Sequence, residues 1–451
     1  METSHAARAP GAEPRAPEPG SAFSKWLLGP LLLAVATTGF GLAAGGHFRP
    51  KVGYVSDFTQ DWLSAREAVA GRPAYGDLWE ALRRHFDGAE PPLDFLRWNA
   101  HPPGSILLAL PLAYLAHEYA FFAWNLATFP LFVLSVWVVL AELGGGWSWR
   151  RAALSAALVA TVGITCFPLL QQVVMGQYNA LLGFLIALAW AADRRGNGAL
   201  AGAAIGLAAA IKLFPAFLLL YLLGTRRWRA TGAAVGVFLA VNAAALGAFG
   251  AGAYRTYLFE AVPEVSARYA TRWHNLSLPA FWLRLFGPTP ESRIVALAPL
   301  PALGKMLAAV SQLAVAAVTL LAAWRATSLA ARDGAFALAV TGMVLVSPIS
   351  WSHYLIMLVM PVGLLAVRLF SSPWRWALVA CVLVMWLPDH FAVRLTFGPE
   401  FVELLSVQRH PPFSPAQNLL LVSAQHYAVL GLFLLLLRFP TAAPAPSGGT
   451  A

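Results

Sequence analysis

The chain has 451 residues, of which 59% are apolar and only 12% are charged. Soluble domains carry about twice that share of charge, so this composition excludes an ordinary soluble enzyme and a disordered chain. We therefore expect an all-α polytopic membrane protein. The net charge of +10 comes from 31 basic and 21 acidic residues. Arginines gather in short loops between apolar runs, as the positive-inside rule requires, so we expect no nucleic acid as a partner.

Residues 1–22 are rich in Ala, Pro, Glu and Gly, which predicts a disordered cytoplasmic tail. A single transmembrane domain is expected over residues 23–438, and a second disordered cytoplasmic tail over 439–451. The apolar runs are long enough to cross a bilayer, alone or as hairpins. We predict a bundle of about twelve transmembrane helices, at about 26–46, 120–142, 152–173, 178–192, 199–211, 214–224, 231–250, 304–324, 335–350, 354–370, 376–388 and 421–438.

Arginine clusters separate many of these runs, and placing the clusters in the cytoplasm puts three longer polar segments outside. These external segments are about 48–118, 251–303 and 389–420. Residues 104–118 in the first segment are apolar but too short to span comfortably. We expect them to form a re-entrant or interfacial helix on the outer side.

The apolar run 199–224 begins and ends beside cytoplasmic arginines, yet it contains a lysine and a proline at its centre. Because proline breaks helices, a hairpin of two short helices turning at Lys212–Pro215 satisfies both flanks. At 1.5 Å per residue, Lys212 would stand about 20 Å above the cytoplasmic face, in the outer half of the membrane.

The sequence lacks several common catalytic signatures. It contains no G-x-x-x-x-G-K-[ST] loop and no G-x-G-x-x-G turn, so nucleotide chemistry has no phosphate cradle. It also has no paired Cys/His spacing typical of a metal site. The two cysteines, Cys166 and Cys381, lie inside apolar runs and are interpreted as apolar packing residues.

The first external segment carries two carboxylates, Asp57 and Asp61, whose spacing places them on one face of a helix. One explanation is helix capping by Ser56 or Asp57, or simple solvation. The other is a general base in a cleft shielded by lipid, with the second carboxylate as a binder. His101 follows in the same segment, either as a solvated loop residue or as part of the site.

Two further polar groups lie at the outer ends of predicted spans. Gln177 and Asn179 form a polar turn between two runs, where they either satisfy backbone groups or bind a ligand. Lys212 is costly at membrane depth unless it has a partner. It either snorkels or pairs with helix carbonyls, or it binds a lipid phosphate near the outer leaflet.

The remaining candidates are also external. His353 lies between two spans, either as a satisfied loop histidine or as a site residue. Arg268, Arg272 and Asn275 lie in the second external segment, where the positive-inside rule does not explain arginines. Guanidinium groups there are suited to a phosphate or pyrophosphate.

Short motifs follow one another in a fixed order between about residues 50 and 370: Asp57-Phe58, Ala65, Gly71-x-Pro73-x-Tyr75, Pro102-Pro103, Gly176-Gln177-Tyr178-Asn179, Ala210-Ile211-Lys212-Leu213-Phe214-Pro215, Asn275-Leu276-Ser277-Leu278, and Ser347-Pro348 with Trp351-Ser352-His353. In this order they resemble the glycosyltransferase 87 family of integral-membrane GT-C enzymes. That family includes polyprenyl-phosphate-mannose-dependent α-1,2-mannosyltransferases.

The resemblance implies a GT-C-like bundle whose active site faces outside and whose donor is a polyprenyl-phosphate sugar. It implies that Asp57 is the catalytic base, with Asp61 as an alternate or helper. We assign donor-phosphate binding to Lys212, Arg268, Arg272 and His353, and acceptor or sugar binding to Gln177, Asn179, Asn275 and His101. The acceptor is expected to be a lipid or glycan and the surroundings membrane lipids. No cofactor or metal is expected, because the lipid phosphate is the leaving group.

Two other classes of function use the same residues differently. A transporter or lipid flippase would also employ an intramembrane Lys212 and polar outer segments, and a scaffold of a cell-envelope complex would tolerate changes at every candidate site. Replacement of Asp57 by Asn separates these classes, because only a transferase would lose sugar transfer.

Overall fold

The computed structural model describes residues 46, 48, 56–92, 95–144, 166–287, 292–398 and 411–440. Both predicted tails, nearly all of the predicted span 26–46 and most of 152–173 lie outside these residues, except for Phe439 and Pro440. The described residues form helices and no strand, apart from one isolated bridge between Ile294 and Phe413. The predicted all-α class is therefore confirmed.

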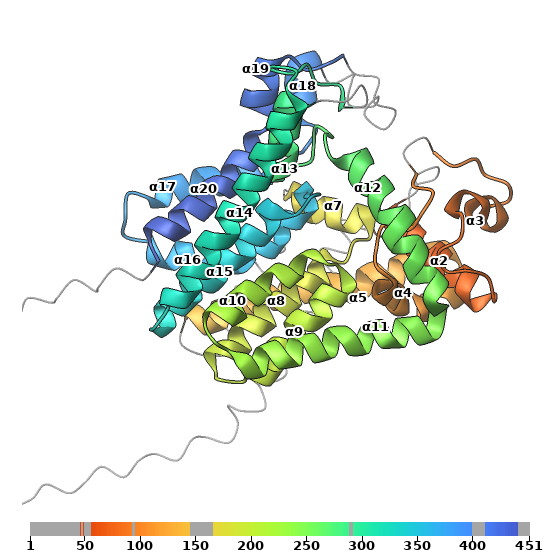
Figure 1. Cartoon of the computed structure of the whole chain (residues 1–451), viewed down its shortest axis with the longest axis horizontal. Helices are drawn as coiled ribbons and strands as arrows, with labels where there is room; N and C mark the ends of the chain where they lie inside the picture. Colours follow the sequence, from red (N-terminus) through yellow and green to blue (C-terminus); the bar gives the residue numbers. More distant parts are fainter. Residues whose placement is uncertain are drawn as a thin grey trace, which may run out of the picture.

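In the described part of the chain, ten helices coincide with apolar runs of the sequence, usually within a few residues at each end. They are α5 (His117–Leu143), α8 (Asn179–Arg194), α9 (Gly198–Ile211), α10 (Leu219–Gly224), α11 (Trp228–Thr256), α14 (Pro301–Arg325), α15 (Leu329–Val346), α16 (Val359–Arg368), α17 (Arg375–Trp386) and α20 (Ala424–Arg438). Figure 1 shows them packed as one bundle.

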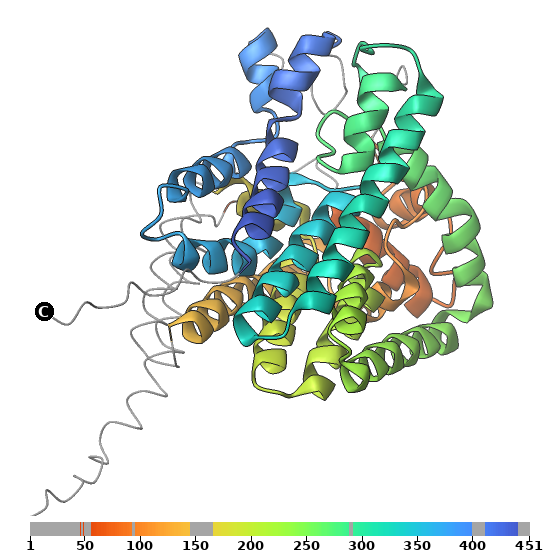
Figure 2. The same cartoon turned by 60° about the vertical axis from the view of Figure 1, so that its left-hand side comes forward.

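Shorter helices cover the polar segments and the breaks. They are α2 (Asp57–Val69), α3 (Leu78–His85), α4 (Pro103–Ala109), α7 (Phe167–Met175), α12 (Val262–Tyr269), α13 (Leu278–Phe286), α18 (Phe391–Phe397) and α19 (Pro415–Gln417), together with single turns of other helix types at η1 (Leu110–Tyr114), η2 (Phe214–Leu218), η3 (Tyr257–Ala261), η5 (Ser352–Leu358) and η8 (Asn418–Val422). Helices α2 to α4 lie on one side of the molecule and α16, α17 and α20 on the other (Figures 1 and 2).

Among the described residues, four helices are long and apolar enough to cross a membrane, or up to seven if each of three bent helix pairs is one span. The predicted count of twelve is not confirmed. Several predicted spans are apolar helices of only 10–17 residues, including Gly198–Ile211 and Ser352–Arg368. The second external segment also differs from the prediction, because helix continues through α11 and η3 to Tyr269 before the chain turns.

The predicted hairpin over 199–224 is present. Helix α9 ends at Ile211, Lys212 is extended (φ −141°, ψ 139°), and η2 and α10 return along the bundle. The hydroxyl of Tyr221 donates to Asp193 Oδ2 at 2.7 Å, and Arg227 pairs with Asp193 at 3.1 Å. These contacts join the end of the hairpin to its start, so Lys212 lies at the opposite end.

Two glycines let α9 lie directly on α11. A Cβ atom at Gly202 would stand 1.9 Å from the carbonyl oxygen of Ala230, and one at Gly206 would stand 2.2 Å from that of Ala234. Small residues four positions apart allow such backbone contact between apolar helices. The hairpin that carries Lys212 is therefore fixed to the long helix α11.

Candidate active site

Asp57 is the first residue of α2. The preceding Ser56 makes no side-chain cap hydrogen bond, so capping by Ser56 is wrong. Instead, the amide Nε2 of Gln177 donates to Asp57 Oδ2. This contact joins residues 120 positions apart in the chain.

A tight turn between α7 and α8 presents Gln177. The two helices are bent by 118°, and Gly176 between them has φ +62°. A Cβ atom there would lie 2.7 Å from Phe58 Cβ and 2.9 Å from a ring atom of Phe121, so the position requires glycine. The backbone is further held by Trp124, whose indole donates to the Gly176 carbonyl at 2.8 Å.

The same glutamine also binds Lys212. The ammonium Nζ donates to Gln177 Oε1 at 2.5 Å and approaches Asn179 Oδ1 at 3.4 Å. It lies 4.8 Å from the centre of the Tyr354 ring, a cation–π distance. The structure thus brings the carboxylate of Asp57 and the ammonium of Lys212 to opposite ends of one side-chain amide.

Asp61 has a different environment from Asp57. Its oxygens lie 2.9 and 3.1 Å from Nδ1 of His101, and it accepts from Asn99 Nδ2 at 3.2 Å. Both Asp61 and His101 are buried, and the His101 ring packs edge-on against Tyr178 at 5.1 Å. Asp61 is thus already paired with a histidine, which favours a supporting role for this carboxylate.

The electrostatics of Asp57 suit a proton acceptor. Its side chain is part-buried and accepts a side-chain hydrogen bond from Gln177 at one oxygen, so the carboxylate keeps capacity to accept a further hydrogen bond from a substrate. Burial nevertheless raises the pKa of the Asp57 carboxyl above its usual range, while the Gln177 hydrogen bond and the charges of His101 and Lys212 offset part of that rise. A raised pKa makes a carboxylate a stronger base.

The ammonium of Lys212 and two further side-chain nitrogen atoms form a set suited to an anion. His353 is buried, and its Nε2 has no hydrogen-bond partner; the buried Nδ2 of Asn179 also lacks one. The centre of the His353 ring lies 5.2 Å from that of the Tyr354 ring, and the Lys212 ammonium lies 4.8 Å from the centre of the same Tyr354 ring. Buried polar atoms are normally hydrogen-bonded, so these atoms indicate a site for a ligand. The described residues hold no group of three or more His, Cys, Asp or Glu side chains suited to a metal ion.

Arg268 and Arg272 lie at the end of α12, beside the segment that carries His353. The guanidinium of Arg272 stands 5.7 Å from the ring centre of Tyr269, and that ring packs edge-on against Trp351 at 5.3 Å. Arg272 is thus connected through the Tyr269 ring to Trp351, two residues before His353.

The side-chain amide of Asn275, which was predicted to bind sugar, makes its hydrogen bonds to the protein backbone. Its Nδ2 donates to the carbonyls of Tyr269 and Pro348, both at 3.0 Å, and its Oδ1 accepts from the backbone of Ser277 and Ser350 at 3.2 and 3.1 Å. These four bonds use the full capacity of the amide. The contacts favour a role in fastening the loop after α12 to the segment before His353.

Sequence reasoning did not single out Tyr354 or Asn99 as site residues. Tyr354 stacks on Phe214 at 5.0 Å and lies beneath the ammonium of Lys212, while Asn99 binds Asp61. In the sequence, Tyr354 follows His353 directly and Asn99 lies two residues before His101. This proximity could have indicated that they belong to the site, but it does not specify which residues they contact across the bundle.

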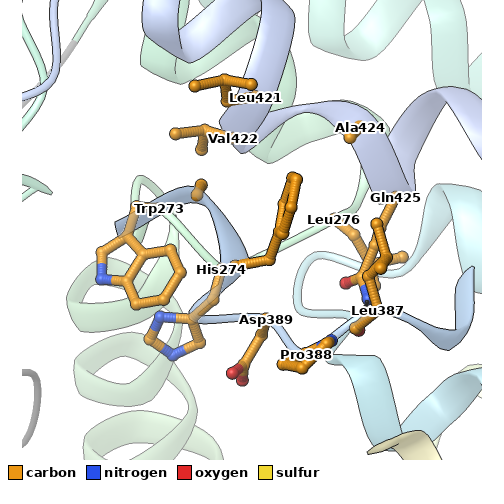
Figure 3. A pocket seen from close by; sticks show the side chains of 12 residues that line it. Trp273, His274, Leu276, Leu387, Pro388, Asp389, Leu421, Val422, Ala424 and Gln425 are labelled. Carbon is orange, nitrogen blue, oxygen red and sulfur yellow. Dashed lines mark hydrogen bonds between the residues drawn. The ribbon is translucent and has the colours of Figure 1, made fainter. Parts of the chain in front are cut away.

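Two cavities border this region. A small one of about 20 Å³, shown in Figure 3, lies between Trp273, His274, Asp389 and Gln425 and holds little more than one water molecule. A larger one of about 310 Å³ is lined by apolar side chains that include Phe132, Val139, Ile356, Val359 and Met385. Part of its wall, Leu355–Gly363, directly follows His353 and Tyr354.

Comparison with known proteins places this arrangement in a family. Residues 99–348 match the family model for glycosyltransferase family 87. The chain belongs to this family. The match includes Gln177, Asn179 and Lys212, whereas Asp57 precedes it and His353 follows it.

Three similar proteins are mycobacterial. Two are named polyprenol-phosphate-mannose-dependent alpha-(1-2)-phosphatidylinositol pentamannoside mannosyltransferases. The one from Mycolicibacterium smegmatis is 30% identical over 59% of this chain and 60% of its own length. The one from Mycobacterium tuberculosis is 28% identical over 65% and 66%. A phosphatidylinositol mannoside mannosyltransferase from M. smegmatis is 28% identical over 77% and 78%.

Proposed function

We propose that this protein is a membrane glycosyltransferase that moves a hexosyl unit from a polyprenyl-phosphate sugar to a hydroxyl of a lipid- or glycan-linked acceptor. The names of its relatives support mannose as the sugar and a polyprenol phosphate as the carrier. The observation that carries the proposal is the placement of Asp57 and Lys212 at the two ends of the Gln177 amide.

The donor phosphate would bind at Lys212. The ammonium, Asn179 Nδ2 and His353 Nε2 can all donate to phosphate oxygens, and the last two lack a partner in the structure. A preorganised set of donors stabilises the negative charge that grows on a departing phosphate. Arg268 and Arg272, at the end of α12, would add positive charge from the outer side.

Asp57 would act as the general base. The acceptor oxygen attacks the anomeric carbon while its proton passes to the Asp57 carboxylate, and the bond from the anomeric carbon to the phosphate oxygen breaks. Polyprenyl phosphate leaves with the bonding electrons. A single displacement of this kind inverts the configuration at the anomeric carbon. The reaction draws on no nucleotide, because the lipid phosphate is itself the leaving group.

The apolar cavity would receive the first isoprenyl units of the donor. Leu355 and Ile356 in its wall follow His353 and Tyr354 on η5, so a chain seated there would lie beside the segment that carries His353. Its apolar walls suit a hydrocarbon chain.

The distribution of charge supports an outer-face location of the site. The hairpin puts Lys212 at one end and Arg194, Arg195 and Arg227 near the other, where α8 ends and α11 begins. Arginine-rich loops favour the cytoplasmic side, so the Lys212 end would face outside. Together with the runs outside the described residues, this orientation fits the twelve-helix arrangement that we propose for residues 23–438.

Replacement of Asp57 by Asn tests the proposal. Removal of a general base typically slows a reaction about 10²- to 10⁴-fold. Membranes containing the Asp57→Asn variant should lose transfer from a radiolabelled polyprenyl-phosphate mannose to endogenous lipid acceptors. Asp87→Asn is the matched control, because Asp87 is exposed and its positive φ of 51° is compatible with Asn.

Equal protein levels and retention of Asp87→Asn activity are required for the comparison. Transfer at the normal rate by the Asp57→Asn variant would overturn the assignment of the base. Normal transfer together with altered lipid uptake would favour a transporter or flippase.

A further inference from the structure

Gln177 occupies an unusual position between two opposite charges. Its side chain is buried, with Nε2 donating to Asp57 and Oε1 accepting from Lys212 at 2.5 Å. An amide has one donating and one accepting end, so the two charges fix its orientation. Gln172 fixes the backbone of Gln177. Its side-chain Nε2 donates to the Gln177 carbonyl, and the Gln177 backbone N–H donates to the Gln172 carbonyl at 3.2 Å.

The amide also keeps the two charged groups apart. Without it, the carboxylate of Asp57 and the ammonium of Lys212 would be free to form a direct ion pair. A direct pair would hold the proton acceptor and the phosphate ligand on each other rather than on substrates. The interposed amide leaves each group partly available.

Hydrogen bonds in a chain strengthen one another. While Lys212 donates to Oε1, the amide is polarised and its N–H is a stronger donor to Asp57. An anion that binds Lys212 draws the ammonium away from Oε1, so the amide becomes a weaker donor and its hold on the carboxylate relaxes. The effect of an anion at Lys212 therefore reaches Asp57 through Gln177.

We propose that Gln177 is a positioning residue that couples binding of the donor phosphate at Lys212 to the proton affinity of Asp57. The proton affinity of Asp57 is lower while the donor site is empty, and it rises when the phosphate binds Lys212. This inference rests on the proposed function, since it requires Asp57 as base and Lys212 as phosphate ligand.

Several other titratable groups face Asp57. They are Asp61 on its own helix, His101 before α4, Lys212 on the hairpin and Tyr354 on η5. His117 at the start of α5 packs against the neighbouring Phe58 at 6.1 Å. Gln177→Met keeps a side chain of similar length between Asp57 and Lys212, so it removes both amide hydrogen bonds without opening the way to a direct ion pair. The other groups stay in place, and the effect on the pH profile can be separated from theirs.

The test is the pH dependence of transfer by purified protein in nanodiscs, with wild type, Gln177→Met and Gln172→Met. The acidic limb of the pH profile of kcat/KM for the donor reports the pKa of the base in the free enzyme, and that of kcat reports its pKa in the donor complex. For the wild type we expect the acidic limb of the kcat profile to lie at higher pH than the acidic limb of the kcat/KM profile. Loss of the Gln177 hydrogen bond should move the kcat/KM limb upward by roughly one pH unit and narrow the gap.

Gln172→Met is the matched control, because this buried glutamine holds the same turn but touches neither charged group. The acidic limbs of the kcat and kcat/KM profiles of this variant should stay at the wild-type pH values even if its transfer rate falls. Identical limbs in Gln177→Met and wild type would overturn the coupling. Transfer that survives Asp57→Asn would instead overturn the proposed function, so the two failures are distinguishable.

Discussion

At the scale of single residues, the site is defined by how differently two carboxylates of one helix are used. Asp61 is bound by His101 and Asn99, while Asp57 accepts one side-chain hydrogen bond, from the Gln177 amide. The Asp57 carboxylate therefore keeps hydrogen-bonding capacity for an acceptor hydroxyl. This difference supports Asp57 as the base and Asp61 as its supporting neighbour.

Lys212 carries a second prediction at this scale. Lys212→Met should reduce kcat/KM for the polyprenyl-phosphate donor by about 10²- to 10³-fold, because a charged donor to the leaving phosphate is lost. Lys305→Met, at an exposed position of α14, is the matched control and should retain activity. Steady-state kinetics with varied donor measure both. An effect confined to KM for the acceptor would contradict the phosphate role.

At the scale of helices and turns, apolar run length and arginine placement predicted most boundaries well. The break at Lys212–Pro215 followed from two physical constraints, a proline and basic flanks on the same side. The extension of helix beyond residue 250 was not predicted, because the placement of the arginine clusters assigned residues from about 251 to an external polar segment. In the structure the backbone at Gly250 has φ +76°. Helix there continues after a kink rather than ending.

Contacts across the bundle could not be predicted. The sequence indicated that Asp57, Gln177 and Lys212 are polar groups at the outer side, but not that one amide joins the other two. For Asn275 the sequence indicated a polar external residue, whereas its four backbone bonds depend on two segments more than 70 residues apart. Side-chain pairing of this range follows from packing, which single-sequence patterns do not encode.

Close packing of α9 on α11 gives a prediction at the element scale. Gly202→Ala should lower stability by about 1–3 kcal/mol, because its methyl group would overlap the Ala230 carbonyl and force the helices apart. Thermal unfolding in detergent, followed by loss of the monodisperse species on size exclusion, measures this change. Gly232→Ala on α11 has open space around its added methyl group and should be neutral or slightly stabilising. Equal midpoints for the two variants would contradict the packing argument.

At the scale of the whole molecule, orientation in the membrane decides which substrates are reachable. In a background with Cys166→Ser and Cys381→Ser, a membrane-impermeant maleimide should label Asp87→Cys on intact cells. It should label Arg229→Cys only after lysis, because Arg229 lies exposed in the basic first turn of α11. The reverse pattern would move the proposed reaction to the cytoplasmic side.

The principal site residues lie where helices are interrupted or begin: Gln177 between α7 and α8, Lys212 between α9 and η2, His353 just after α15, and Asp57 at the first residue of α2. Side chains at such junctions can be exchanged without disturbing the hydrogen-bond ladder of any long helix. A scaffold built this way permits a lineage to acquire new sugars and acceptors by point substitution while its membrane architecture persists.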